Sequence, residues 1–194
     1  AFRREKLEKL EGGAFSFVAP GAALNEVEKI CEDIDAFATI TLGQRHILFE
    51  MGETELICRR LEGDFLDYKN AIPRRNPISV TVDTKAMLES LDRVSVVISE
   101  KLKSPVRCIF EQDRVLLSAK TANGDAKDVC RIDGDGQGLE IGFNNRYLMD
   151  ALRFAPADEL KLELNTGISP AILVPTDGEE SFLYMVLPVR LKAQ

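Results

Sequence analysis

The sequence predicts an α+β protein built from a repeated unit of one strand, one helix and three further strands. Three aliphatic segments, residues 15–20, 78–83 and 139–144, each lead through a proline or polar residue into an amphipathic helix. Their last residues lie 63 and then 61 residues apart. A regular period of this size indicates a repeated supersecondary unit. We therefore expect helices on one face of antiparallel sheets.

Each unit continues after its helix with three strand-like segments. These segments are 36–42, 46–50 and 53–60, then 106–110, 114–119 and 126–132, and finally 159–164, 171–175 and 182–188. Apolar and polar residues alternate in 40–42 and 161–164, as expected for sheets with one solvent-exposed face. Turns are predicted at 43–45, 111–113 and 176–179. Asp83 and Asn144 supply side-chain oxygens at two of the predicted helix starts.

Residues 62–77 form the predicted linker between the first and second units. The segment contains Pro73 and Pro77 and has no periodic apolar pattern. It also carries Phe65 and Tyr68, so we expect a linker that packs against the protein rather than a flexible tether.

The number of units indicates how the chain divides into domains. If two units form one domain, residues 74–194 form a complete domain and residues 1–73 form half of another. The chain opens with Ala-Phe-Arg-Arg, without an initiator Met. We therefore expect it to begin inside a longer protein, at the end of a strand.

Composition argues against several classes of protein. The chain has 194 residues, 45% of them hydrophobic, which is enough for one large or two small cores. Its net charge of −7 is unlike that of a free-standing sequence-specific DNA binder, which is usually basic. No apolar run approaches the ~18 residues of a membrane span, and no secretory signal opens the chain.

No residue pattern in the sequence indicates an enzymatic reaction or a metal site. The four cysteines, Cys31, Cys58, Cys108 and Cys130, lack metal-ligand spacing, so we expect buried, reduced thiols in a cytoplasmic protein. The single histidine, His46, has no nucleophile nearby and is interpreted as a strand or surface residue. Residues 133–138 contain Asp133 and Asp135 but lack the third acidic ligand and the distal Glu of a calcium loop, and they are expected to connect two units. No enzyme activity, cofactor or metal is predicted.

The carboxyl-terminal segment, residues 182–191, is apolar almost to its end. Chain termini are usually polar and frayed. The segment is therefore either a docked last strand or one wall of a binding groove, and the residues alone favour the docked strand.

Four segments together resemble the beta subunit of bacterial DNA polymerase III, the replicative sliding clamp. They are Leu61–Tyr68 with Ile72-Pro73, Arg93–Ser95, Ile141–Leu148 and Leu187–Leu191. The resemblance covers nearly the whole chain in order. Leu66 stands where the family usually has proline, and Lys192-Ala193-Gln194 follows the leucine at which many members end.

The resemblance implies a ring of two subunits, with helices lining the hole and sheets outside. Residues 1–73 would be the latter half of the central domain with its linker, and residues 74–194 the carboxyl-terminal domain. Such a homodimeric clamp would encircle duplex DNA without sequence preference. It would tether the polymerase and clamp-loader subunits through clamp-binding peptides, and catalyse nothing itself. The alternative is a repeat-built peptide-binding or structural module with no role on DNA.

The resemblance also implies three sets of site residues. A hydrophobic peptide-binding groove would be walled by Leu66, Asn70, Ala71, Ile168, Pro170, Met185, Val186, Leu187, Pro188, Val189, Arg190 and Leu191. The residues facing DNA would include Lys29, Lys85, Arg146 and Arg153, of which the last two belong to the one helix with a positive face. The subunit interface would include Val96 and Val97 at a helix end and Asp125 and Asp128 on an edge strand. With the resemblance, a groove wall outweighs a merely docked strand at the carboxyl end.

Overall fold

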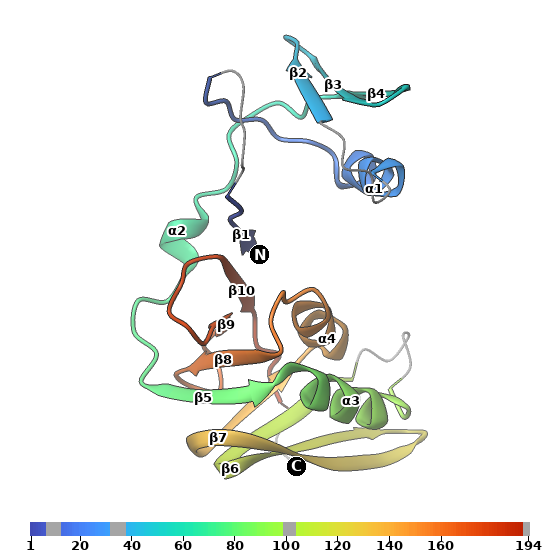
Figure 1. The fold of residues 1–194 in the computed structure, drawn as a ribbon. Coiled ribbons are helices and arrows are strands. Elements are labelled where there is room, and N and C mark those ends of the chain that lie inside the picture. Colours follow the sequence, from blue (N-terminus) through green and yellow to red (C-terminus); the bar gives the residue numbers. More distant parts are fainter. Residues whose placement is uncertain (7–12, 32–37, 99–103, 192–194) are drawn as a thin grey trace. The chain divides into compact units, whose positions relative to one another are not determined.

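The computed structural model describes residues 1–6, 13–31, 38–98 and 104–191 (Figure 1). The chain divides into two compact units, residues 8–69 and residues 1–7 with 70–194. Their boundary falls inside the predicted linker, within the short helix α2 (Tyr68–Ala71). No helix in the described ranges is long and apolar enough to cross a membrane.

The smaller unit contains one helix and a three-stranded antiparallel sheet. Its elements are α1 (Gly21–Ile30), β2 (Ala38–Leu42), β3 (His46–Met51) and β4 (Thr54–Arg59), with sheet order β2-β3-β4. Ile47 and Phe49 alternate with more exposed residues along β3 and are buried. The ring of Phe17 meets the ring of Phe49 edge-on, with centroids 6.4 Å apart. These residues therefore mark the core face of the sheet.

The strand expected at residues 15–20 does not form. Residues 13–20 have no regular structure before α1. The segment is tied to the end of β4 by one backbone bond, from the Leu61 N–H to the Val18 carbonyl oxygen at 2.9 Å. An aliphatic run predicts a strand only where a partner strand completes the ladder.

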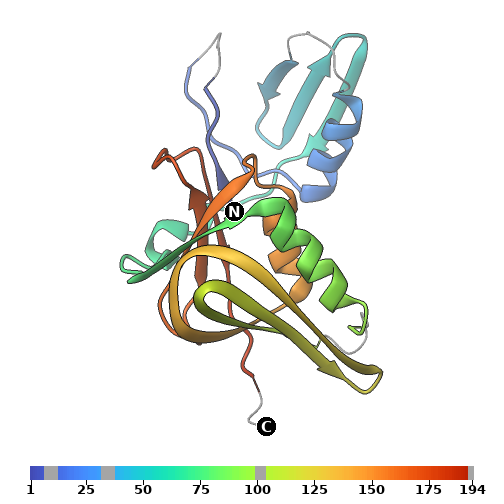
Figure 2. The same cartoon turned by 60° about the horizontal axis from the view of Figure 1, so that its bottom comes forward.

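The larger unit is a seven-stranded antiparallel sheet with two helices. The strand order is β1-β10-β9-β8-β5-β7-β6. The elements are β1 (Phe2–Arg3), β5 (Ile78–Asp83), α3 (Thr84–Ser95), β6 (Val106–Thr121), β7 (Gly124–Phe143), α4 (Asn145–Arg153), β8 (Glu159–Leu164), β9 (Ala171–Pro175) and β10 (Phe182–Val186). Helices α3 and α4 lie side by side on the same side of the sheet (Figures 1 and 2). Their buried side chains, such as Leu91 and Leu152, join Val80 and Leu162 of the sheet in one core.

Both predicted helix caps are present. The Asp83 carboxylate accepts a hydrogen bond from the Ala86 N–H at 2.7 Å. The Asn144 side-chain oxygen accepts from the N–H groups of Arg146 and Tyr147, at 3.1 and 3.4 Å. Each cap satisfies donors that the first helical turn leaves unpaired.

The turn predicted at residues 111–113 and the connection predicted at 133–138 are both strand. β6 and β7 form one long hairpin whose register shifts between Phe110 and Arg114, so the polar residues are absorbed in bulges. Gly136 lies against β6, where an added Cβ would be 2.3 Å from the Cβ of Phe110. Glycine at position 136 is therefore explained by the close approach of the two strands and not by a loop.

The carboxyl end is docked on the end of β7. β10 ends at Val186, two residues before the predicted end. Pro188 then forms a β-bridge with Phe143, and the Val189 N–H donates to the Gly142 carbonyl oxygen at 2.7 Å.

The cysteines differ in burial. Cys108 and Cys130 are buried, and burial raises the pKa of both thiols. Cys58 is partly exposed and Cys31 is exposed, so the expectation of four buried thiols was wrong for this pair. The four thiols are free.

Candidate functional site

An apolar cavity of about 400 Å³ lies between α4 and β10, and we call it the α4–β10 cavity. Its lining residues are Ala1, Tyr147, Asp150, Ala151, Phe154, Tyr184, Met185, Val186 and Leu187. Tyr147, Ala151 and Phe154 follow one another at the spacing that places side chains on one face of a helix. The helix supplies one wall of the cavity and the last strand supplies the other.

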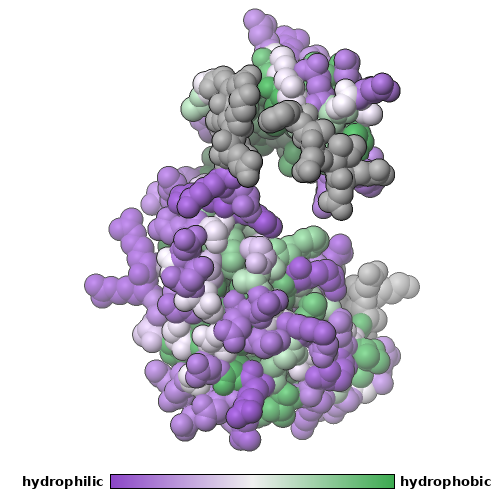
Figure 3. Space-filling view, viewed as in Figure 1, coloured by the Kyte–Doolittle hydropathy of each residue, from purple (hydrophilic) through white to green (hydrophobic). Residues whose placement is uncertain are grey.

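Three large side chains at this cavity are mostly exposed. Tyr147, Leu187 and Phe154 have relative exposures of 63%, 63% and 62%. In the view of Figure 3 the larger unit is mainly hydrophilic, with hydrophobic areas scattered among polar ones. Exposed apolar side chains that gather around one cavity are therefore a candidate binding surface.

The predicted groove residues fall into several groups. Met185, Val186 and Leu187 line the α4–β10 cavity. Pro188 to Leu191 follow directly and run along the end of β7. Ile168, 78% exposed, and Pro170 lie in the connection between β8 and β9 and do not line the cavity. Asn70 and Ala71 lie in α2, and Leu66 belongs to the smaller unit.

The helical wall of the cavity is not predicted by the sequence pattern. Tyr147 and Phe154 belong to the apolar stripe of the amphipathic helix that follows residues 139–144, and such a stripe predicts burial. Leu148 and Leu152 face the core, whereas Tyr147 and Phe154 face outward. The width of the apolar stripe is the signal that could have identified them. With an aromatic residue at each margin, the stripe is wider than one core-facing side requires.

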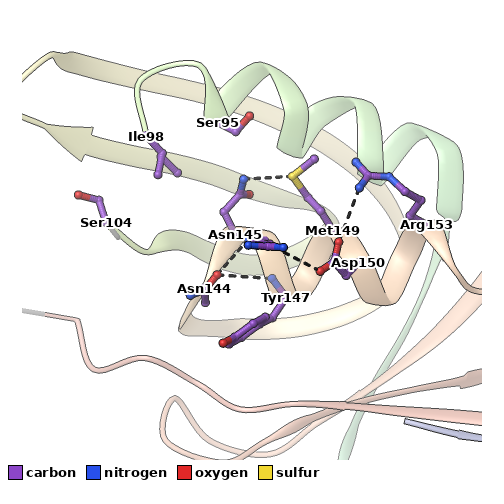
Figure 4. Close-up of a pocket in the computed structure, with 10 residues that line it drawn as sticks. Ser95, Ile98, Ser104, Asn144, Asn145, Tyr147, Met149, Asp150 and Arg153 are labelled. Atoms are coloured by element: carbon purple, nitrogen blue, oxygen red, sulfur yellow. Dashed lines mark hydrogen bonds and ion pairs between the residues drawn. The ribbon is translucent and has the colours of Figure 1, made fainter. Parts of the chain in front are cut away.

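A second cavity, of about 730 Å³, lies between the end of α3 and the start of α4 (Figure 4). Its lining residues are Ser95, Ile98, Ser104, Asn144, Asn145, Arg146, Tyr147, Met149, Asp150 and Arg153. The Asp150 carboxylate lies between two arginines, Arg146 and Arg153, and Figure 4 shows its pair with Arg153. Its oxygens lie 3.9 Å from Arg146 Nε and 3.6 Å from Arg153 Nη1. The positive charge of α4 is therefore partly neutralised within the helix.

The other two predicted DNA-facing residues differ from each other. Lys29 is paired with Glu26 at 2.7 Å. Lys85 is exposed at the start of α3 and makes no ion pair with any residue that the structure describes. Three of the four cations are thus paired with a carboxylate of their own helix.

The predicted interface residues are split between different faces. Val96, just after α3, is 83% exposed, whereas Val97 is partly buried. Asp125 and Asp128 lie on β7, which pairs with β6 along this stretch and with β5 at Asp133, opposite Thr81, so the edge-strand position of the two residues stays a prediction. Asp128 pairs across the strands with buried Leu117, and Asp125 with exposed Lys120.

Asp128 is bound inside the chain. Its Oδ2 lies 2.7 Å from Arg93 Nε, and its Oδ1 accepts from the Val129 N–H at 2.8 Å. Partial burial acts to raise the pKa of Asp128, but these hydrogen bonds and the nearby guanidinium outweigh it and lower the pKa.

Among the described residues, no group of three or more His, Cys, Asp or Glu side chains could hold a metal ion. His46 is exposed at the start of β3.

Solved structures with this fold are sliding clamps. The structure of a putative DNA polymerase III beta subunit from Eubacterium rectale gives a TM-score of 0.82 at 27% identity, over 89% of this chain and 47% of that one. A sliding clamp from Bartonella birtlesii, solved bound to griselimycin, gives 0.82 at 29% identity, over 90% and 47%. The α+β architecture of this chain is therefore that of the DNA clamps.

Sequence comparisons agree with the structural ones. The beta sliding clamp of Staphylococcus aureus (strain Mu50) is 31% identical over 192 residues, 98% of this chain and 50% of that protein. The beta sliding clamp of Synechocystis sp. is 31% identical over 181 residues, 91% and 46%. The family model for the DNA polymerase III beta subunit, C-terminal domain, matches residues 69–190. The chain belongs to the DNA polymerase III beta subunit family, and it spans about half the length of these relatives.

Proposed function

We propose that this chain is part of a sliding clamp that encircles duplex DNA and tethers the replicative polymerase and clamp-loader subunits. The observation that carries the proposal is the family match over residues 69–190, within a chain that follows the clamp relatives along nearly its whole length. The protein acts in the cytoplasm as a non-catalytic processivity factor. Residues 1–73 are the latter half of its central domain with the linker, and residues 74–194 its carboxyl-terminal domain.

The α4–β10 cavity is the centre of the proposed peptide-binding groove. Partner peptides place apolar side chains against Leu187, Tyr147 and Phe154. These three side chains are mostly exposed, so covering them removes a large apolar surface from water. Among the described residues that line the cavity, Asp150 carries the one charged side chain, and its carboxylate already faces two arginines. Within the larger unit, Asn70, Ala71, Ile168 and Pro170, with the docked residues 188–191, extend the groove beyond this centre.

Contact with DNA is weak and independent of sequence. Lys29, Arg146 and Arg153 each form an ion pair with a carboxylate of their own helix. Lys85 forms no ion pair with a described residue. Backbone contacts of this kind are electrostatic and weaken with salt. A ring holds DNA by topology, so a chain with net charge −7 needs only a modestly positive inner face.

The test uses the intact gene product loaded onto circular duplex DNA by a clamp loader. A clamp stays on the closed circle at high salt and slides off when a restriction enzyme linearises the DNA. Nicking the circle without opening it is the matched control, and it should release nothing.

The same assay separates the clamp from the alternative, a peptide-binding or structural module with no role on DNA. The acidic composition and the internally paired cations are the observations that favour that alternative. Failure to load, or retention unaffected by linearisation, would support it or a simple surface binder. The mass of the intact gene product, which should be about twice that of this chain, is an independent check.

A further inference from the structure

We propose that Asp150 couples the two cavities that α4 borders, so that a DNA phosphate held by Arg146 and Arg153 weakens peptide binding in the α4–β10 cavity. The inference rests on the proposed function and adds a link between its DNA-facing surface and its peptide-binding groove. We call the second cavity, between the end of α3 and the start of α4, the α3–α4 cavity.

Helix α4 is a wall of both cavities. Tyr147 and Asp150 line the α4–β10 cavity and the α3–α4 cavity alike. Phe154 lines only the first, whereas Arg146 and Arg153 line only the second. The two cations therefore belong to one cavity, and the carboxylate between them belongs to both.

The two ion pairs of Asp150 are loose. Its oxygens lie 3.9 Å from Arg146 Nε and 3.6 Å from Arg153 Nη1. Both distances exceed the range of about 2.7–3.2 Å that N–H···O hydrogen bonds span. The arginine side chains are also 82% and 51% exposed. Each guanidinium group therefore keeps accessible N–H donors for a further anion.

A phosphate group can use the donors that Asp150 leaves free. A guanidinium group binds a phosphate through two parallel N–H···O bonds. The α3–α4 cavity, of about 730 Å³, leaves room for the phosphate beside the arginines. Duplex DNA presents such groups along both of its strands. A bound phosphate competes with Asp150 for the arginines and places a second negative charge near its carboxylate.

The state of Asp150 then affects the neighbouring cavity. A peptide in the α4–β10 cavity covers the wall to which Asp150 belongs and takes water from its carboxylate. Covering a carboxylate costs more when its cationic partners are engaged elsewhere. The same peptide should therefore bind more weakly while a phosphate is held. By linkage, a bound peptide weakens the phosphate contact by the same factor.

The experiment compares the intact gene product loaded on closed circular duplex DNA with the same protein free in solution, after removal of the clamp loader. Fluorescence anisotropy measures the dissociation constant of a labelled clamp-binding peptide in both states. At low salt the loaded protein should bind the peptide about fivefold more weakly, at the low end of typical couplings between sites. Linearising the DNA releases the protein and should restore the affinity of the free state.

Substitutions test whether Asp150 carries the effect. Asp150→Asn should bring the ratio of the two constants to about one, because an amide has no charge to leave unpaired. The double variant Arg146→Gln with Arg153→Gln should do the same, because neither side chain then holds the phosphate. Asp92→Asn is the matched control on α3: Asp92 is exposed, forms no ion pair with a described residue, and should leave the fivefold ratio intact. A variant that only distorts the groove changes both constants and not their ratio.

The outcomes separate this inference from the proposed function. A ratio of one in wild-type protein that loads and slides off linearised DNA would overturn the inference and leave the clamp standing. A fivefold ratio that persists in Asp150→Asn would also overturn it, since DNA would then obstruct the groove directly. If Asp150→Asn does not fold, the arginine double variant carries the same comparison. A protein that does not load overturns the proposed clamp and this inference with it.

Discussion

The hydroxyl group of Tyr184 on β10 donates a 2.8 Å hydrogen bond to the carbonyl oxygen of Phe154, the residue after α4. The Phe154 N–H in turn donates to the Asp150 carbonyl oxygen at 3.1 Å and closes the last turn of the helix. One bond therefore joins the two elements whose side chains form the α4–β10 cavity. The separation of the cavity walls is set by this bond and by the core packing behind it.

Replacing Tyr184 with Phe should lower the free energy of unfolding by about 1 kcal/mol, because the Phe154 carbonyl loses its partner. Urea denaturation measures the change. Tyr147→Phe is the control, since the Tyr147 hydroxyl makes no hydrogen bond among the described residues. Equal stability of the two variants would show that the bond between β10 and α4 does not hold the cavity walls together.

Leu187→Asp and Val189→Asp should abolish binding of a labelled clamp-binding peptide to the intact gene product. Leu187 is 63% exposed at the α4–β10 cavity. A carboxylate at this position would be buried under the apolar side chain of the peptide without a hydrogen-bond partner, which is costly. Fluorescence anisotropy measures the affinity. Val129→Asp, on the 56% exposed Val129 of β7, is the control and should bind normally. Undiminished binding by Leu187→Asp would remove the cavity from the groove.

The helix starts could be predicted from the sequence because their causes are local. Asp83 and Asn144 bond to N–H groups two or three residues further along, so a short window of sequence contains the whole interaction. The hairpin of β6 and β7 depends instead on pairing between distant residues. The polar sequence of residues 111–113 is typical of a turn. In the structure Gln112 pairs with Asp135, so the strand continues through this segment. Only the partner strand decides between these outcomes.

The candidate site was predictable only in part for the same reason. The apolar carboxyl end indicated one wall, and Met185, Val186 and Leu187 do line the α4–β10 cavity. The helical wall was missed because an apolar residue on an amphipathic helix is assigned to the core by default. Whether Tyr147 is buried depends on how far the sheet extends beneath α4, and no local pattern contains that distance.

Asn144→Ala should destabilise the larger unit by about 1 kcal/mol, the usual cost of losing a side-chain helix cap. The N–H groups of Arg146 and Tyr147 would lose their acceptor at the start of α4. Asn144→Asp should retain most of the stability, because a carboxylate also caps. Asn123→Ala, at the exposed tip of the hairpin, is the control and should change stability by less than about 0.5 kcal/mol. Chemical denaturation compares the three variants.

The Arg93–Asp128 bond should make stability depend on pH in acid. The pKa of Asp128 is lowered in the folded chain, whereas an unfolded Asp titrates near about 3.9. The unfolded chain therefore binds this proton at higher pH, and the stabilisation is complete above the unfolded pKa and lost as the pH falls through the folded pKa. The difference in unfolding free energy between wild type and Asp128→Asn should be constant near neutral pH and shrink below about pH 4. Denaturation at a series of pH values measures it, and a difference that is undiminished in acid would contradict the assignment.

Gly142→Ala should detach the carboxyl-terminal segment from β7. An added Cβ at Gly142 would lie 2.6 Å from the Val189 carbonyl oxygen and 2.6 Å from Leu191 Cδ2. The leucine can turn away, but the backbone at Val189 has to move, which strains its 2.7 Å bond to the Gly142 carbonyl oxygen. Overpacking of this kind costs about 1–3 kcal/mol.

Limited proteolysis measures the detachment directly, because the segment 188–191 should be cleaved faster in Gly142→Ala than in the wild type. Gly21→Ala is the matched control, since an added Cβ at the first position of α1 meets nothing within 4 Å. Peptide affinity should fall together with protection of the segment if the docked residues complete the groove. Faster digestion with unchanged affinity would restrict the groove to the α4–β10 cavity. Digestion at the wild-type rate would show that the segment is not held by its contact with Gly142.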